Sequence, residues 1–267
     1  MGKVIVFGNH KGGVGKSTLA VLYAYWLADL QQQSVCVIDL DAQANSSKSL
    51  ARFAAGIESA QLFRPQARVP QALGATHDAQ RIVLLPGSRH LAEVELAPPD
   101  KVIPAFRSCL LEAVQRFDSV VVDTPPALGL RMSAALIGAD AVACPIELEA
   151  YSIDGMADML RTIFGVRKRY NPRLRLGGIL LNRFNAHSQR QKAALQHLAV
   201  AFAEFVIPAR ISTRSAIPEA LASGVPVWRL PRTAAREASL EVMAAFELLH
   251  RRVVGPDAIP RAAEPLA

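Results

Sequence analysis

Residues 11–18 read Lys-Gly-Gly-Val-Gly-Lys-Ser-Thr, and the expected architecture follows from them. An apolar, β-branched run at residues 4–7 precedes this stretch, and residues 19–31 repeat leucines and aromatics at helical spacing. A strand, a glycine-rich turn and a helix in this order are the context of a phosphate-binding loop. Glycines let backbone N–H groups surround an anion, and the helix N-terminus adds a favourable dipole. We therefore expect residues 11–18 to bind nucleotide phosphates.

Two side chains of this loop carry most of the expected chemistry. Lys16 is placed to reach the β- and γ-phosphates, and the Ser17 hydroxyl is placed to ligate Mg²⁺. The other residues that we assign to the nucleotide are Gly12, Gly13, Val14, Gly15 and Thr18.

The loop departs from the usual phosphate-loop pattern at its start. His10 stands where the first glycine is expected, and a second lysine, Lys11, opens the loop. This variant resembles the deviant Walker A motif of the ParA/MinD ATPases, whose extra lysine marks the family. The resemblance implies that ATP is the nucleotide and that Lys11 also contacts its phosphates.

A second motif follows the next apolar run, residues 34–40, which we interpret as a buried strand. Asp39 and Asp41 lie at its carboxyl end, where the ligands of α/β sheets bind. The segment resembles the family's Asp-x-Asp-Pro-Gln-Gly-Asn switch, in which the second aspartate orients the attacking water. The resemblance assigns Asp41 to the water, and we place Asp39 beside the magnesium. Ala42 and Ala44 replace the proline and the glycine, which leaves the loop geometry and the hydrolysis rate open.

A third motif is the apolar strand expected at residues 119–123. It ends in Asp123, as in the Walker B arrangement, in which the carboxylate holds a water of Mg²⁺. Thr124-Pro125-Pro126 follows and resembles the family's Asp-x-Pro-Pro switch.

The adenine site is expected from the second half of the chain. In the family a polar residue after the strand that we expect at residues 176–181 commonly touches the base, so Asn182 is the candidate, and Pro208 is added to the nucleotide-binding set. Residues 214–227 also resemble the C-terminal part of small ParA proteins.

The resemblance spans about residues 3–250 and implies one P-loop ATPase domain over residues 1–254. Its fold class is α/β, with a mostly parallel central sheet flanked by helices on both faces. We expect further helices at residues 105–116, 149–169, 187–202 and 233–254, a surface excursion at 61–80, and a flexible tail at 255–267.

Charge and cysteine content restrict the partners. Residues 1–150 have a balance of −1 and residues 151–267 a balance of +8, which favours an anionic polymer as partner. We assign non-specific duplex DNA to Arg183, Arg190, Lys192, Arg210 and, above all, Arg214. The three separated cysteines do not suggest a metal site, and the absence of a leader or a long apolar stretch favours a cytoplasmic, nucleoid-associated protein.

The resemblance implies an ATPase that forms an ATP-dependent sandwich dimer, in which Lys11 reaches the partner's nucleotide. It implies slow hydrolysis, stimulated by a ParB-type centromere-binding protein, and segregation of plasmid or chromosomal DNA. A MinD-like membrane-positioning ATPase is the alternative, although residues 255–267 lack the basic amphipathic helix that it requires. A nitrogenase-like reductase lacks its cysteines, whereas a small-molecule kinase or ligase and a positioning ATPase for another protein complex stay open.

Overall fold

The computed structural model describes residues 2–70, 81–149, 152–231 and 233–255. Its centre is a seven-stranded sheet in the order β3-β2-β4-β1-β5-β6-β7, in which every neighbouring pair is parallel. Parallel strands are covered on both faces, which explains why they read as continuous apolar runs. The strands are β1 (Lys3–Phe7), β2 (Val35–Asp39), β3 (Ile82–Leu85), β4 (Ser119–Asp123), β5 (Ala141–Ile146), β6 (Arg175–Phe184) and β7 (Val206–Ser212).

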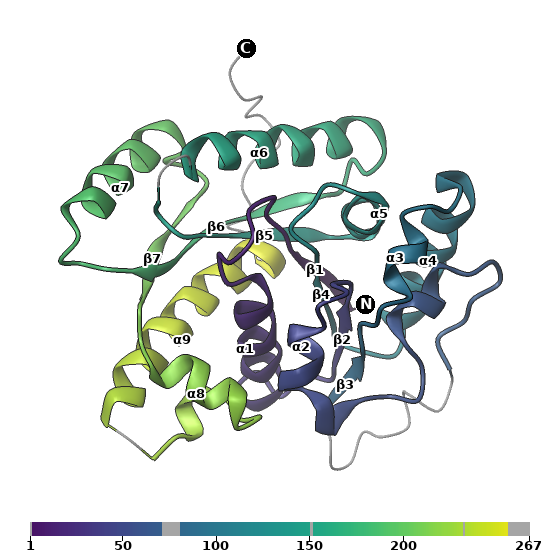
Figure 1. The fold of residues 1–267 in the computed structure, drawn as a ribbon, viewed down its shortest axis with the longest axis horizontal. Coiled ribbons are helices and arrows are strands. Elements are labelled where there is room, and N and C mark those ends of the chain that lie inside the picture. The colour runs from purple at the N-terminus through teal and green to yellow at the C-terminus, as the bar shows by residue number, and fades with distance from the viewer. Residues whose placement is uncertain (1, 71–80, 150–151, 232, 256–267) are drawn as a thin grey trace.

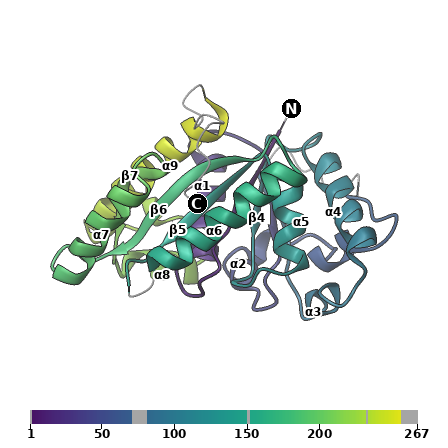
Figure 2. The ribbon, with the colours of Figure 1, turned by 90° about the horizontal axis from the view of Figure 1, so that it is seen from above.

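Helices cover both faces of the sheet, as predicted. Helices α1, α8 and α9 pack on one face, and α4, α5, α6 and α7 pack on the other (Figures 1 and 2). The helices are α1 (Lys16–Asp29), α2 (Asn45–Ser49), α3 (Leu91–Val94), α4 (Pro99–Ala113), α5 (Leu130–Gly138), α6 (Ser152–Arg169), α7 (Gln189–Ala201), α8 (Ala216–Ala222) and α9 (Thr233–Val254). No helix in the described ranges is long and apolar enough to cross a bilayer.

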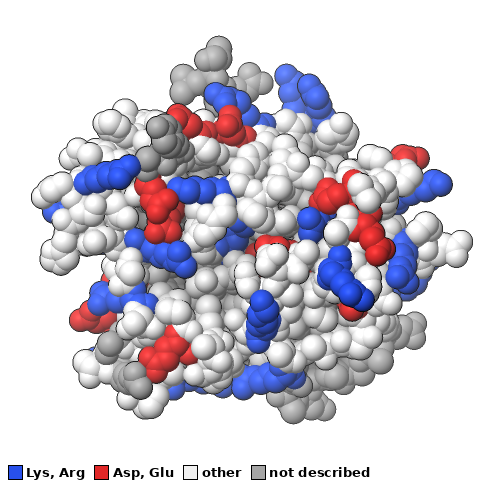
Figure 3. Space-filling view, viewed as in Figure 1, with Lys and Arg blue, Asp and Glu red and all other residues white. Residues whose placement is uncertain are grey.

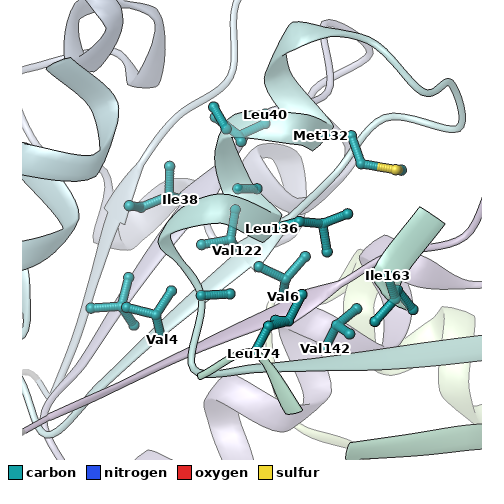
Figure 4. Packing of buried hydrophobic residues seen from close by; sticks show 14 of the residues in the cluster. Val4, Val6, Ile38, Leu40, Val122, Met132, Leu136, Val142, Ile163 and Leu174 are labelled. Atoms are coloured by element: carbon teal, nitrogen blue, oxygen red, sulfur yellow. The ribbon is translucent and has the colours of Figure 1, made fainter. Parts of the chain in front are cut away.

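The two faces of the sheet carry separate apolar cores. On one face, Val6 and Val122 from the central strands pack with Leu136 of α5 and Ile163 of α6 (Figure 4). On the other face, α1 is buried on every side from residue 19 to residue 28, because α8 and α9 cover the surface that the sheet leaves open. A helix in such surroundings is apolar all round.

Two expectations about local structure were wrong. The helix expected at 105–116 spans Pro99–Ala113: Pro99 occupies the first turn, where the missing N–H would have no partner in the helix, and Pro104 lies inside the helix. Residues 61–80 are not entirely a surface excursion, since Leu62 and Phe63 are buried and the Phe63 ring stacks on Phe106 at 4.4 Å between centroids. Residues 71–80 and the expected tail from residue 256 onward lie outside the described residues.

The register of the three central strands brings the motifs together. Phe7 of β1 and Asp39 of β2 both pair with Asp123 of β4. The loops that follow these strands therefore leave the same edge of the sheet, where ligands of α/β folds bind.

Candidate nucleotide-binding site

The loop between β1 and α1 has the backbone of a phosphate cradle. Gly13 and Gly15 adopt positive φ values of 80° and 92°. A Cβ atom on Gly15 would lie 2.1 Å from Nδ2 of Asn182, so the conformation and the close approach both require glycine here. Helix α1 begins at Lys16 with no side-chain cap, which leaves the N–H groups of its first turn available to an anion.

The two lysines of the loop have different surroundings. Lys16 is 6% exposed, and its Nζ donates to the carbonyl oxygen of Lys11 at 2.9 Å. Burial lowers the pKa of Lys16, whereas the nearby carboxylates of Asp123 and Asp41 act in the opposite direction. Lys11 points outward instead, and its Nζ donates to Oε2 of Glu149 at 2.6 Å. Lys16 is thus internal to the loop, and Lys11 is presented at the surface.

Asp39 and Asp123 form a buried carboxylate pair below the loop. Each receives a hydroxyl from the start of α2: Ser46 Oγ donates to Asp123 Oδ2 at 2.7 Å, and Ser47 Oγ donates to Asp39 Oδ2 at 2.6 Å. Burial, and then the charge of Asp39, raise the pKa of Asp123 to about 7. Burial also raises the pKa of Asp39, although hydrogen bonds from Ser47 and from the Asp41 N–H oppose the change.

The residues around Asp123 fit a magnesium ion. Oδ1 of Asp123 is buried and has no hydrogen-bond partner, and the neighbouring Ser17 hydroxyl lowers the pKa of this carboxyl. Carboxylate and hydroxyl oxygens are the hard donors that Mg²⁺ prefers, with phosphates and waters completing its shell. Among the described residues no group of three or more His, Cys, Asp or Glu could hold a metal. Both oxygens of Asp39 already accept hydrogen bonds, so its part as a ligand stays a prediction.

The loop after β2 is a tight turn around Asp41. The Gln43 N–H donates to Asp41 Oδ1 at 3.0 Å, and the Ala44 N–H donates to the Asp41 carbonyl at 2.9 Å. Ala44 adopts the left-handed region, with φ 54° and ψ 41°. This is the position at which the resembling motif has glycine, so the alanine keeps a glycine-like backbone at a conformational cost. Gly87 packs closely against this turn, and a Cβ atom at residue 87 would lie 2.6 Å from the Asp41 carbonyl oxygen.

A cavity of about 740 Å³ lies beside the phosphate loop and has the size expected for the rest of a nucleotide. Thr18, Asn182 and Arg183 line it, together with residues of β7 and α8. The buried Asn182 side chain donates to the Val14 carbonyl at 2.9 Å and so contacts the loop directly. Pro208 is not brought there: it is exposed on β7 and lines a different cavity with Leu181 and Leu195.

The five basic residues predicted to bind DNA do not share one environment. Arg183 belongs to the nucleotide site, because its Nη1 donates to the Gly13 carbonyl at 2.9 Å. Arg214 bridges to Glu237 and Glu241 of α9. The three others are exposed: Arg190 and Lys192 lie on α7, and Arg210 lies on β7. On the face drawn in Figure 3, basic and acidic side chains are interspersed and do not form a continuous basic surface.

Several site residues were not predicted from the sequence. Ser46 and Ser47 follow the switch motif directly, and a pair of hydroxyls next to two carboxylates is a signal that could have found them. Glu149, the partner of Lys11, is 138 positions away in the chain and is identified only by the fold.

Comparisons with known proteins agree with this geometry. A family described as an AAA domain matches residues 2–176. The chain is 40% identical over 256 residues to protein IncC of Escherichia coli, with 94% of this chain and 70% of that protein covered. It is 33% identical over 250 residues to the chromosome-partitioning ATPase Soj of Thermus thermophilus, with 91% and 96% covered.

Among solved structures, Cyanothece McdA in complex with ATP has the same fold. It superposes with a TM-score of 0.77 at 18% identity, covering 93% of this chain and 96% of that one. The sequence relatives and the arrangement of the phosphate loop with its carboxylate pair lead to one assignment. The chain belongs to this AAA-domain family and is an ATPase of the ParA/MinD partitioning type.

Proposed function

We propose that this partitioning ATPase forms an ATP-dependent sandwich dimer in which Lys11 of each subunit contacts the nucleotide of the other. The observation that carries the proposal is the division between the two loop lysines. Lys16 folds into its own loop, whereas the Lys11 ammonium lies outside it on Glu149, with 36% of the Lys11 side chain exposed. An exposed ion pair contributes little stability, so Lys11 can exchange Glu149 for a phosphate at low cost.

Within one subunit, the loop residues have separate tasks in hydrolysis. The α1 N-terminus and Lys16 bind the phosphates, and Ser17 and Asp123 would hold Mg²⁺, which when bound neutralises phosphate charge. Asp41 orients the attacking water, a role that rests on the resemblance of residues 39–45 to the family's switch, and its carboxylate acts to raise the pKa of Lys16 against the effect of burial. Phosphoryl transfer needs positioning and charge stabilisation more than covalent chemistry, which agrees with this set of groups. Asn182 is the candidate for contact with the adenine.

The proposed partners are duplex DNA and a ParB-type protein. The +8 balance of residues 151–267 and the exposed Arg190, Lys192 and Arg210 support non-specific contact with duplex phosphates. A dimer presents two such surfaces, so ATP raises DNA affinity through bivalency. A ParB-type protein stimulates hydrolysis and thereby releases DNA, which is consistent with a cytoplasmic, nucleoid-associated role in plasmid or chromosome segregation.

The dimer is tested with Lys11→Ala and Lys16→Ala, using light scattering for mass and calorimetry for binding of an ATP analogue. Lys16→Ala is expected to lose nucleotide binding, and Lys11→Ala to keep it but remain monomeric with ATP. Arg161→Ala, which removes an exposed ion pair on α6, serves as the control for loss of a surface cation. A Lys11→Ala dimer as stable as that of the unaltered protein would refute the proposal.

A further inference from the structure

Arg131 lies at the start of α5 and is enclosed by two elements that are distant in the chain. Its side chain is 12% exposed. Nε donates to Oε1 of Glu95 at 2.7 Å, and Nη1 donates to the carbonyl oxygen of Leu40 at 2.9 Å. The guanidinium therefore joins the turn after α3 to the backbone that connects Asp39 with Asp41.

Glu95 holds this guanidinium in place and is itself fixed. Its Oε2 accepts the Leu130 N–H at 2.6 Å, so the carboxylate also caps the N-terminus of α5. Burial opposes ionisation of Glu95, but the hydrogen bonds from Arg131 and Leu130 outweigh it and lower its pKa. The carboxylate reaches this place only because residue 129 is glycine, since a Cβ there would lie 2.3 Å from Oε2 of Glu95.

Leu40 is held at both of its backbone polar groups. Its N–H donates to the Asp123 carbonyl at 2.9 Å, and its C=O accepts from Arg131. Its side chain is fully buried in the apolar cluster that contains Met132 and Leu136 of α5 (Figure 4). The peptide that leads from Leu40 into Asp41 is held at both of its polar groups: the Leu40 carbonyl accepts from Arg131, and the Asp41 N–H donates to Asp39 Oδ1 at 3.0 Å. Arg131 is the partner of its carbonyl.

We propose that Arg131 is a positioning residue for ATP hydrolysis: it orients the Leu40–Asp41 peptide and thereby aims the Asp41 carboxylate at the attacking water. The proposal rests on the role proposed above for Asp41. Arg131 belongs to the helix that follows Asp123 and the Thr124-Pro125-Pro126 segment, so it ties the carboxylate turn to the magnesium side of the site. It lies outside all three sequence motifs.

If Arg131 only stabilised the fold, its substitution would lower the thermal midpoint without a specific loss of turnover. Removing one partner of a partly buried ion pair lowers stability, whereas a shift of about 1 Å in a positioned group can reduce turnover by about 100-fold. A positioning residue should therefore affect kcat and leave ATP affinity intact, because Lys16 and the loop N–H groups bind the phosphates without Arg131.

The test uses Arg131→Gln, with Arg116→Gln as the matched control. Arg116 follows the C-terminal end of α4 and is also half-buried, and its Nη1 also donates to backbone carbonyls, those of Val69 and Pro70. Single-turnover hydrolysis, ATP-analogue affinity and thermal midpoint are measured for both. We expect Arg131→Gln to hydrolyse ATP about tenfold or more slowly with affinity changed less than about threefold, and Arg116→Gln to keep its rate. Gly129→Ala, which displaces Glu95 and leaves Arg131 in the chain, should reproduce the slow turnover.

Asp41→Ala and the Asp41→Ala/Arg131→Gln double variant separate this inference from the function on which it rests. If Arg131 acts through Asp41, the second substitution adds no further loss to Asp41→Ala. An Asp41→Ala protein that hydrolyses ATP normally would overturn the role of Asp41, and with it the proposed route of action. If Asp41→Ala stalls but Arg131→Gln turns over at the rate of Arg116→Gln, or loses rate and affinity together, the positioning role is wrong while the proposed function stands.

Discussion

Asp39 and Asp123 stand at paired positions of β2 and β4, and neither is exposed to solvent. Two carboxyl groups this close cannot both ionise freely, and each has one serine hydroxyl from α2 to offset the repulsion. The site is thus built for a cation, and the protein without one holds an electrostatic cost at its centre.

The pH dependence of stability should reveal this cost. Burial and the charge of Asp39 raise the pKa of Asp123 to about 7 in the folded protein, whereas the unfolded chain releases this proton near the ordinary aspartate pKa of about 3.8. The folded state binds more protons between these values, so stability falls as pH rises from about 4 to 7. We expect Asp123→Asn to remove this loss, leaving the variant more stable than the unaltered protein at pH 8 by roughly 1–3 kcal/mol. Urea unfolding at pH 5 and pH 8 in a metal chelator measures it, and parallel pH profiles would contradict it.

The two aspartates of the first switch should differ in hydrolysis. Asp41→Ala should bind ATP and stall, because the phosphate contacts remain while the water loses its carboxylate. Asp39→Ala should instead be less stable, because it leaves the hydroxyl and N–H of Ser47 without their acceptor. Single-turnover assays and thermal midpoints on both variants distinguish the roles. Normal hydrolysis by Asp41→Ala together with a stall in Asp39→Ala would reverse the assignment.

An alanine-to-glycine substitution usually lowers stability, but at Ala44, which adopts the left-handed region, we expect it to raise stability. Left-handed backbone costs a residue with a Cβ about 1–2 kcal/mol, and the extra freedom of glycine in the unfolded chain offsets part of this. Ala44→Gly should therefore stabilise the protein by about 0.5–1 kcal/mol. Ala199→Gly, at an exposed position within α7, should destabilise it by about 1 kcal/mol. Denaturant unfolding of the Ala44→Gly and Ala199→Gly variants measures whether the free energy of unfolding changes in opposite directions.

The ion pairs of Arg214 alter what its removal should do. Because this side chain is engaged by Glu237 and Glu241, Arg214→Ala should lower stability by about 1 kcal/mol and leave the salt dependence of DNA binding unchanged. Arg190→Ala and Lys192→Ala, at exposed positions of α7, should each reduce the salt slope by about one without loss of stability. Binding titrations of the ATP-bound protein over a range of salt test both, and a reduced slope for Arg214→Ala would restore it as a DNA contact.

Local patterns predicted the parts of this site that depend on neighbours in the chain. The strand, the loop glycines and the helix lie within residues 3–29, and Asp39 and Asp123 were placed correctly because each ends an apolar strand. The glycine-like turn at Ala44 was left open, since an alanine in the sequence does not reveal its φ value.

Contacts between distant segments could not be predicted in this way. The pairs of Lys11 with Glu149, Arg183 with Gly13 and Arg131 with Leu40 each join residues at least 91 positions apart. The sequence around a charged residue contains no pattern that identifies its distant partner. Arg183 was grouped with other basic residues by charge, and Arg214 also by its place in the segment that resembles small ParA proteins, whereas the fold gives the two side chains different partners.

The strand order also determines when this ATPase can become active during its synthesis. The strand that leads into the phosphate loop lies at the centre of the sheet, and its two neighbours are formed by residues 119–123 and 141–146. A nascent chain that ends before residue 119 has neither neighbour for β1. Sheets built from such distant pairings fold slowly, because a long stretch of chain must be ordered before the contacts form. At about 5–20 residues per second, the ribosome adds the segment from β1 to β5 over many seconds. The emerging protein thus stays unable to bind nucleotide until more than half of it has been made.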